Sequence, residues 1–228
     1  MFLVLRLCLG AHCSRGAAWL HDANERRFGR QSLRTSAWPS TKGVIFMATK
    51  ATVYKAELEI SDIDRGYYAT HHLTLAQHPS ENDRRLMARL ITFALFANER
   101  LEFGRGLSNE EDPDLWQRDY AGNIESWIEL GQPDESAVRR ACGRAQQVTL
   151  VSYSGNSAEV WWNKNASSFA RSKNLTVIDL DCGEVDLATR FLQRTMRLQA
   201  MIQECHCQLI GGGETVGIRP RVRMTSNR

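Results

Sequence analysis

The chain has 228 residues, 43% of them hydrophobic and 24% charged, a composition typical of a globular domain with its own core. No apolar run is long enough to span a bilayer, so we expect no membrane partner. The net charge of +3 is unevenly distributed: residues 1–46 hold seven Lys or Arg and two acids, which leaves 29 − 7 = 22 basic and 26 − 2 = 24 acidic residues in 47–228, a net of −2. Nonspecific nucleic-acid binding would therefore need a local basic patch.

Residues 1–46 show no domain pattern. Their apolar start resembles a short signal segment, and their Arg-rich, acid-poor character resembles a transit peptide. A third interpretation is an over-extended reading frame with the true start at Met47, and we favour it because the organised pattern begins immediately afterwards. We expect this leader to be unstructured and to contribute nothing to the core. The six cysteines form no disulfide framework and no pair of CxxC motifs, which favours reduced thiols in a cytoplasmic protein.

The ordered part opens with two predicted strands and a helix. Residues 52–60 and 67–78 alternate between apolar and polar side chains, which predicts an antiparallel hairpin. Ser80 is the expected cap of a long helix whose apolar stripe runs to about Leu101. Its last turns would place Glu99 and Glu102 on one side.

The middle of the chain predicts a second hairpin followed by a helix. Asp114 begins one strand, residues 124–130 form the next, and a helix starts at Asp134 or Ser136 and runs to about Ala145. An apolar strand at 147–154 then fits the interior of a sheet. The tryptophans at 116, 127, 161 and 162 are expected to serve packing rather than base stacking.

The last third alternates short strands with one helix. Strands are predicted at 158–162 and 175–181, and a helix at 185–194. The remaining residues predict a final run of short strands or a small terminal sheet, with Gly211–Gly213 as a hairpin turn. Together these elements predict an α/β (α+β) fold with a mixed central sheet flanked by helices, in a single domain spanning 47–228.

The stretch from Glu110 to Val151 contains the two carboxylates that are candidate metal ligands. Asp114 and Glu129 lie 15 residues apart, and a hairpin would bring them together across the strand ladder. Hard divalent cations such as Mg²⁺ take one or two carboxylates plus water. We therefore expect Asp114 and Glu129 to bind Mg²⁺.

These residues resemble the motifs of the PD-(D/E)xK nuclease superfamily. Pro113-Asp114 matches the first motif and Glu129 the acid of the second, whereas Gly131 stands at the lysine position. Gln132 is adjacent, and Arg140 on the following helix could supply a cation from another backbone position. Arginine stays protonated, so it is a poor general base.

A resemblance to the YaeQ family covers almost all of 47–228. It is carried by ATVYKAELEISDIDRGYYATHHLTLAQHPSE, FANERLEFGRGLS, PDLW, WIELGQPDE, RRACGRA, VWW and QRTMRLQ, which occur in this order. The resemblance implies a bacterial cytoplasmic protein with a variant of the PD-(D/E)xK nuclease-like fold, no established activity and a link to transcription elongation. It also implies a catalytic site of Asp114, Glu129, Gln132 and Arg140, with Glu102 and Arg105 in support.

Three functional hypotheses follow. The first is a magnesium-dependent phosphodiesterase acting on nucleic acid. The second is a non-catalytic binding or regulatory protein, with a protein partner that the sequence does not identify. The third is a structural relic whose two carboxylates are too far apart to share an ion.

Overall fold

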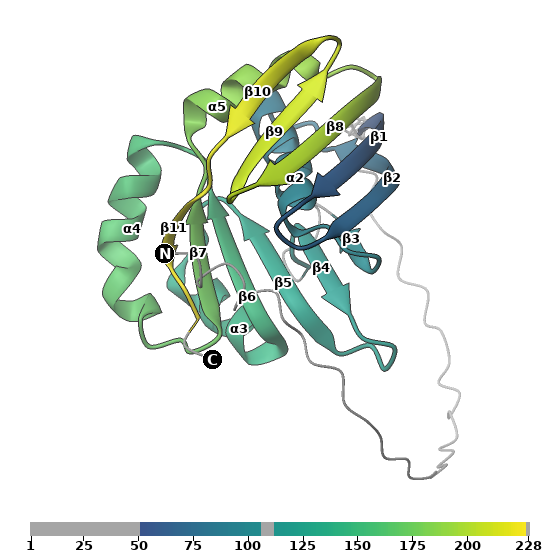
Figure 1. Cartoon of the computed structure of the whole chain (residues 1–228). Coiled ribbons are helices and arrows are strands. Elements are labelled where there is room, and N and C mark those ends of the chain that lie inside the picture. Colours follow the sequence, from purple (N-terminus) through teal and green to yellow (C-terminus); the bar gives the residue numbers. More distant parts are fainter. Residues whose placement is uncertain (1–50, 106–111, 227–228) are drawn as a thin grey trace, which may run out of the picture.

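The structure is a computed structural model and describes residues 51–105 and 112–226. The predicted leader at 1–46 and Glu110 lie outside the described residues. Within these described residues the fold consists of two mixed β-sheets and four α-helices (Figure 1), so the predicted α+β class is confirmed. In the described part of the chain, no helix has the length and apolar character needed to cross a membrane.

Sheet A has the strand order β10-β9-β8-β1-β2. The strands β1 (Thr52–Asp62) and β2 (Tyr67–Gln77) pair antiparallel, which confirms the predicted first hairpin. On its other side β1 pairs in parallel with β8 (Thr195–Gln203). The sheet continues through β9 (His206–Gly211) and β10 (Glu214–Ile218). The predicted run of short C-terminal strands is therefore confirmed, whereas the alternative of a separate terminal sheet is wrong, because β8, β9 and β10 extend the sheet begun by the N-terminal hairpin.

Sheet B has the strand order β11-β7-β6-β5-β4-β3. Its centre is parallel and consists of β5 (Ile124–Leu130), β6 (Ala145–Ser152) and β7 (Leu175–Asp179). Antiparallel strands flank it, namely β3 (Leu101–Phe103), β4 (Leu115–Arg118) and β11 (Arg221–Met224). The predicted hairpin at 114–130 is confirmed as β4 and β5.

The helices cover sheet B on both faces. Helices α3 (Glu135–Arg144) and α4 (Asn156–Phe169) bury Val138, Ala141 and Phe169 against one face of sheet B. Helices α2 (Asp83–Phe96) and α5 (Cys182–Ala188), with the short 3-10 helix η1 (Thr189–Phe191), lie between the other face and sheet A (Figure 1). The layers are thus sheet A, α2 with α5, sheet B, and α3 with α4.

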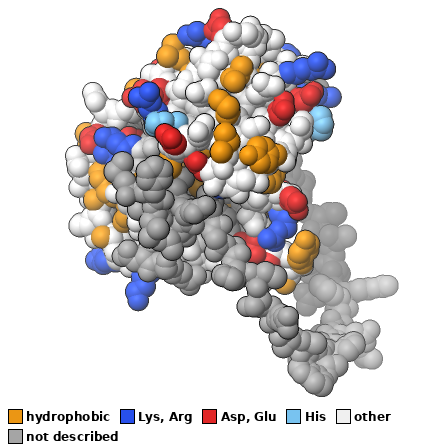
Figure 2. Space-filling view, viewed as in Figure 1, with side chains coloured by type: hydrophobic (Ala, Val, Ile, Leu, Met, Phe, Trp, Pro, Cys, Tyr) orange, Lys and Arg blue, Asp and Glu red, His pale blue; other side chains and the backbone are white. Residues whose placement is uncertain are grey.

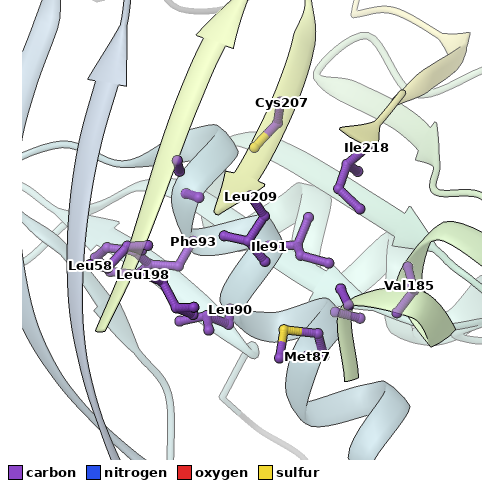
Figure 3. Close-up of a cluster of buried hydrophobic side chains, with 14 of the residues drawn as sticks. Leu58, Met87, Leu90, Ile91, Phe93, Val185, Leu198, Cys207, Leu209 and Ile218 are labelled. Atoms are coloured by element: carbon purple, nitrogen blue, oxygen red, sulfur yellow. The ribbon is translucent and has the colours of Figure 1, made fainter. Parts of the chain in front are cut away.

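Helix α2 forms the centre of the main core. Its residues from Leu86 to Ala94 are all buried, because both sheets pack on it. Figure 3 shows Met87, Leu90, Ile91 and Phe93 of α2 pointing toward Leu198 and Leu209 of sheet A and toward Val185 of α5. Leu115, Ile128 and Leu130 of sheet B belong to the same cluster.

Three predicted elements differ from the structure. The N-cap of α2 is Asn82, whose side chain accepts the Arg85 backbone N–H, and not Ser80. The helix ends at Phe96, so Glu99 lies in the following turn and Glu102 on β3 instead of the helix. Residues 158–162 are helical within α4, where Trp161 packs against Phe169 and donates to the Pro133 carbonyl. These contacts outweigh the strand preference of the Val-Trp-Trp sequence.

Gly211 allows β9 to pack closely on its neighbours. A Cβ atom there would lie 2.5 Å from Leu198 Cδ2 and 3.2 Å from Phe191 Cδ1, and both of these side chains are buried. We expect Gly211→Ala to lower the free energy of unfolding by about 1–3 kcal/mol, the usual effect of overpacking a core. Gly217→Ala on β10 is the control, because nothing lies within 4 Å of its added Cβ. Urea denaturation measures both, and equal losses would contradict this explanation.

Candidate functional site

Asp114 lies at the start of β4 and is almost fully buried, with 4% of its surface exposed. Its Oδ1 accepts from Arg85 Nη2 at 2.6 Å, and its Oδ2 accepts from the Leu130 backbone N–H at 2.8 Å. Arg85 also donates through Nη1 to the Leu130 carbonyl at 3.2 Å. The carboxylate of Asp114 and the guanidinium of Arg85 therefore join the first turn of α2 to the start of β4 and the end of β5.

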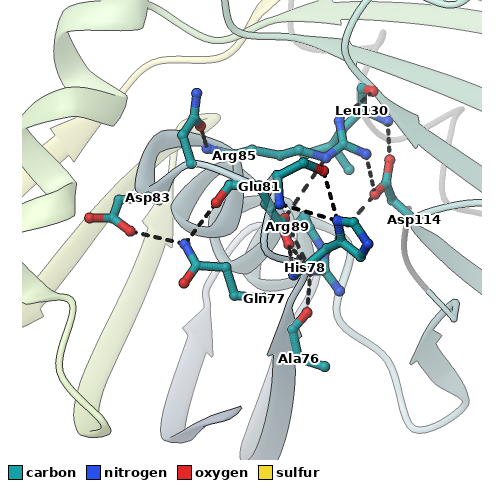
Figure 4. A network of polar contacts seen from close by, with 11 residues as sticks. Ala76, Gln77, His78, Glu81, Asp83, Arg85, Arg89, Asp114 and Leu130 are labelled. Carbon is teal, nitrogen blue, oxygen red and sulfur yellow. Dashed lines mark hydrogen bonds and ion pairs between the residues drawn. The ribbon is translucent and has the colours of Figure 1, made fainter. Parts of the chain in front are cut away.

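A second buried ion pair continues this cluster toward sheet A. Arg89 Nη1 lies 3.1 Å from both carboxylate oxygens of Glu81 and 3.3 Å from the Ala76 carbonyl. Arg85 Nε lies 3.8 Å from Glu81 Oε1, and Arg89 Nε lies 4.0 Å from Asp114 Oδ1. Figure 4 shows these four side chains converging beside the N-terminus of α2. We call Glu81, Arg85, Arg89 and Asp114 the charged cluster; it has two acids and two bases.

Glu129 lies next to this cluster on β5. Burial, followed by the negative charge of Asp114, raises the pKa of Glu129 from its usual 4.5 to about 7, while a hydrogen bond from Trp127 and the charge of Arg85 act in the opposite direction. The Trp127 Nε1–H donates to Glu129 Oε2 at 3.2 Å. Burial lowers the pKa of Arg85, but the charge of Asp114, with contributions from Tyr153 and Glu81, leaves that pKa raised overall. Arg85 is therefore a fixed cation, whereas Glu129 titrates near neutral pH.

The other predicted site residues have partners other than the Asp114 carboxylate. Gln132 is exposed and donates to Ser157 Oγ at 2.7 Å. Arg140 is exposed on α3, near Asp134. Glu102 pairs with Arg118 at 3.0 Å, and Arg105 with Asp112 at 3.2 Å. Of the predicted site, the structure thus brings together Asp114 and Glu129 only.

Arg85 and Arg89 were absent from the predicted site. A usable signal was present, because Glu81, Arg85 and Arg89 are spaced four residues apart and so share one side of a helix. Arg89 also interrupts an otherwise apolar stretch. In the described ranges, 51–105 and 112–226, no three His, Cys, Asp or Glu side chains gather in a way that could hold a metal ion.

Comparison with known proteins identifies a family. The family model described as "YaeQ protein" matches residues 47–220. The chain is 45% identical over 158 residues to "Uncharacterized protein YaeQ" of Salmonella typhi and 43% identical over 158 residues to the protein of that name in Escherichia coli (strain K12); each match covers 69% of this chain and 87% of the relative.

Two solved structures are similar throughout the folded region. The crystal structure of YaeQ protein from Xanthomonas axonopodis pv. citri matches with a TM-score of 0.75 and 53% identity, over 77% of this chain and 99% of that one. YaeQ protein from Pseudomonas syringae matches with a TM-score of 0.74 and 29% identity, over 78% and 98% of the respective chains.

The raised pKa of Glu129 has a consequence for stability. Because the folded protein holds this proton more tightly than the unfolded chain, the free energy of unfolding falls as the pH rises from about 4.5 to about 7. We expect Glu129→Gln, which mimics the protonated form, to stabilise the protein at pH ~8 by up to about 3 kcal/mol and to change little at pH ~5. Urea denaturation at both pH values measures this. Glu102→Gln, at an exposed acid, should show no such pH-dependent gain, and an unchanged pH profile in Glu129→Gln would contradict the assignment.

The Arg85–Asp114 pair should be strongly coupled. Removing one partner leaves the other charge buried and unpaired, so we expect Asp114→Ala and Arg85→Ala each to cost about 3–5 kcal/mol. The double variant should cost clearly less than the sum of the two. Urea denaturation of the four proteins gives the coupling energy. The same cycle at the exposed pair Arg118–Glu102 should give about 1 kcal/mol or less, and additive losses at Arg85 and Asp114 would refute the coupling.

Proposed function

The chain belongs to the YaeQ family, and we propose that it is a non-catalytic nucleic-acid-binding protein. The geometry of the charged cluster supports the non-catalytic part, and the resemblance of Pro113-Asp114 and Glu129 to the nuclease motifs supports nucleic acid as the ligand. The observation that carries the non-catalytic part is the 2.6 Å contact between Arg85 and Asp114. In this proposal the domain is a variant of the PD-(D/E)xK nuclease-like fold in which an arginine neutralises the first acid.

The carboxylates, as arranged, do not fit Mg²⁺. A hydrolytic metal site needs carboxylate oxygens that are free to converge on one ion. Asp114 uses one oxygen for Arg85 and the other for the Leu130 N–H. Glu129, with a pKa of about 7, is about half protonated at neutral pH. A metal would therefore have to displace both a guanidinium and a proton.

Gly131 supports the same proposal. Its φ of 104° lies in the left-handed region, where a lysine would be strained. A Cβ atom at this position would lie 3.7 Å from Arg85 Nη1, so a lysine would also approach a like charge. Arg85 thus lies beside the backbone position that carries the lysine in the nuclease motif, but its permanent positive charge prevents it from acting as a base.

A magnesium-dependent phosphodiesterase is the second candidate. It is favoured by the proximity of the two acids, since the charge of Asp114 contributes to the raised pKa of Glu129. Binding of Mg²⁺ by Asp114 and Glu129 is expected only if this candidate function is correct. A regulatory role linked to transcription elongation would also suit a binding protein, and it rests on the family resemblance alone.

A cleavage assay separates the two candidates. At pH ~8 Glu129 is ionised, so this condition favours metal binding most. We expect no Mg²⁺- or Mn²⁺-dependent cleavage of supercoiled plasmid, single-stranded DNA or RNA, and no saturable heat in calorimetric titration of either metal.

The matched variants decide the origin of any activity. Asp114→Asn and Glu129→Gln change the two acids, whereas Glu102→Gln changes an exposed acid on the neighbouring strand β3. Metal-dependent cleavage that disappears in the first two variants, with the fold retained and with Glu102→Gln fully active, would overturn the non-catalytic proposal.

A further inference from the structure

Positive charge is concentrated in one segment of the folded region. Residues 135–173 contain six Lys or Arg and two acids, a net of +4. Residues 47–134 and 174–228 together contain 22 − 6 = 16 basic and 24 − 2 = 22 acidic residues, a net of −6. The weak overall charge therefore conceals a local basic patch.

All six basic side chains of this segment are exposed on the α3 and α4 layer. They are Arg139, Arg140, Arg144, Lys164, Arg171 and Lys173. Val138 and Ala141 turn one side of α3 toward sheet B, which leaves the arginines on the outer side. We call these six residues the basic helix face.

The chain after α4 brings its cations alongside α3. Arg171 Nη2 lies 3.4 Å from Glu135 Oε1 at the start of α3, and Asn174 Nδ2 donates at 3.0 Å to the Cys142 and Ala145 carbonyls at its end. Lys173 therefore lies beside the same helix. Two separate segments thus place cations along α3, which is roughly 15 Å long.

Two acids at the start of α3 lie beside these cations. Asp134, the N-cap of the helix, lies near Arg140. Glu135 pairs with Arg139 at 3.2 Å and with Arg171 at 3.4 Å, so one carboxylate serves two arginines. Glu159 pairs instead with Arg221 and Arg223 of β11. Arg144, Lys164 and Lys173 have no ion pair within the described part of the chain.

We propose that the basic helix face binds the phosphodiester backbone of nucleic acid, an assignment that rests on the binding function proposed above and gives it a location. Four of the six cations are arginines, whose guanidinium groups match phosphate oxygens in pairs. The cations are spread along a row and do not converge on one point, which suits an extended polyanion better than a single free phosphate. Phosphate contacts of this kind give affinity without base specificity.

A membrane surface suits this face less well. Interfacial helices bury a broad apolar side in the lipid, whereas the only large hydrophobic residue of the described α3 and α4 that is strongly exposed is Val160. Trp161 and Trp162 pack against the core cluster beneath. On the face seen in Figure 2, Lys and Arg groups lie next to Asp and Glu groups at several places.

Charge reversal with a matched control tests the proposal. The triple variant Arg144→Glu/Lys164→Glu/Lys173→Glu reverses three of the cations that have no ion pair in the described part of the chain. The control Lys55→Glu/Arg197→Glu/Arg219→Glu reverses three exposed cations outside the basic helix face and changes the net charge equally. Fluorescence anisotropy with labelled single-stranded DNA and RNA and with duplex DNA, in EDTA and low salt, measures Kd for the full-length proteins. Circular dichroism melting confirms folding.

We expect the basic-helix-face variant to bind at least about tenfold more weakly than the unchanged protein, and the control about twofold at most. The log–log slope of affinity against salt should flatten only in the basic-helix-face variant. Equal weakening in the two variants, or no binding by the unchanged protein, would overturn the proposal. The proposal would also be overturned if the basic-helix-face variant lost binding to vesicles rich in phosphatidylserine but kept its binding to nucleic acid. Because EDTA removes metal, this binding experiment is independent of the cleavage assay. Metal-dependent cleavage would refute only the non-catalytic proposal. Equal weakening of nucleic-acid binding in the two triple variants would refute only the assignment of binding to the basic helix face.

Discussion

The buried pair between Arg85 and Asp114 is the interaction on which the arrangement of the two sheets depends. Apolar packing of α2 is favourable but has no direction, so it allows the helix to slide or turn between the layers. The 2.6 Å contact, with the bonds of both side chains to the Leu130 backbone, fixes the first turn of α2 against the ends of β4 and β5. Arg89 and Glu81 then attach the same helix to the end of β2. Helix α2 is thereby attached to both sheets by charged side chains that are largely buried.

The same pair also influences the charge states of the two neighbouring acids, Asp114 and Glu129. Two neighbouring carboxylates repel each other in a buried site, and the protein relieves this by two different means. Asp114 receives a permanent cation, whereas Glu129 holds a proton up to about pH 7. A divalent metal would provide the same relief with one ion. The protein side chains already supply that compensation, which is the physical basis for proposing a binding protein.

Local signals in the sequence predicted the local structure. Alternation at 52–60 and 124–130 predicted β1 and β5. Of the two predicted starts of α3, Asp134 and Ser136, the structure has Asp134 as the N-cap. The parallel pairing of β1 with β8 has no local signal, because it joins strands about 140 residues apart. For the site, Asp114 and Glu129 were found because a hairpin brings them together. Arg85 was missed because a charged residue in the first turn of a helix usually faces water, and only the packing of two sheets on α2 buries it.

The pairing of β1 with β8 also orders events during folding. Every strand of sheet B except β11 lies between these two partners in sequence. During synthesis, sheet B from β3 to β7 can therefore assemble while β1 and β2 are present only as a two-stranded hairpin, which is marginally stable in water. Sheet A, and with it the cover over α2, is completed only when residues 195–218 emerge. The side of α2 that faces sheet A is thus incompletely covered while the residues between α2 and β8 are synthesised, and a contact of such long sequence separation is expected to form slowly.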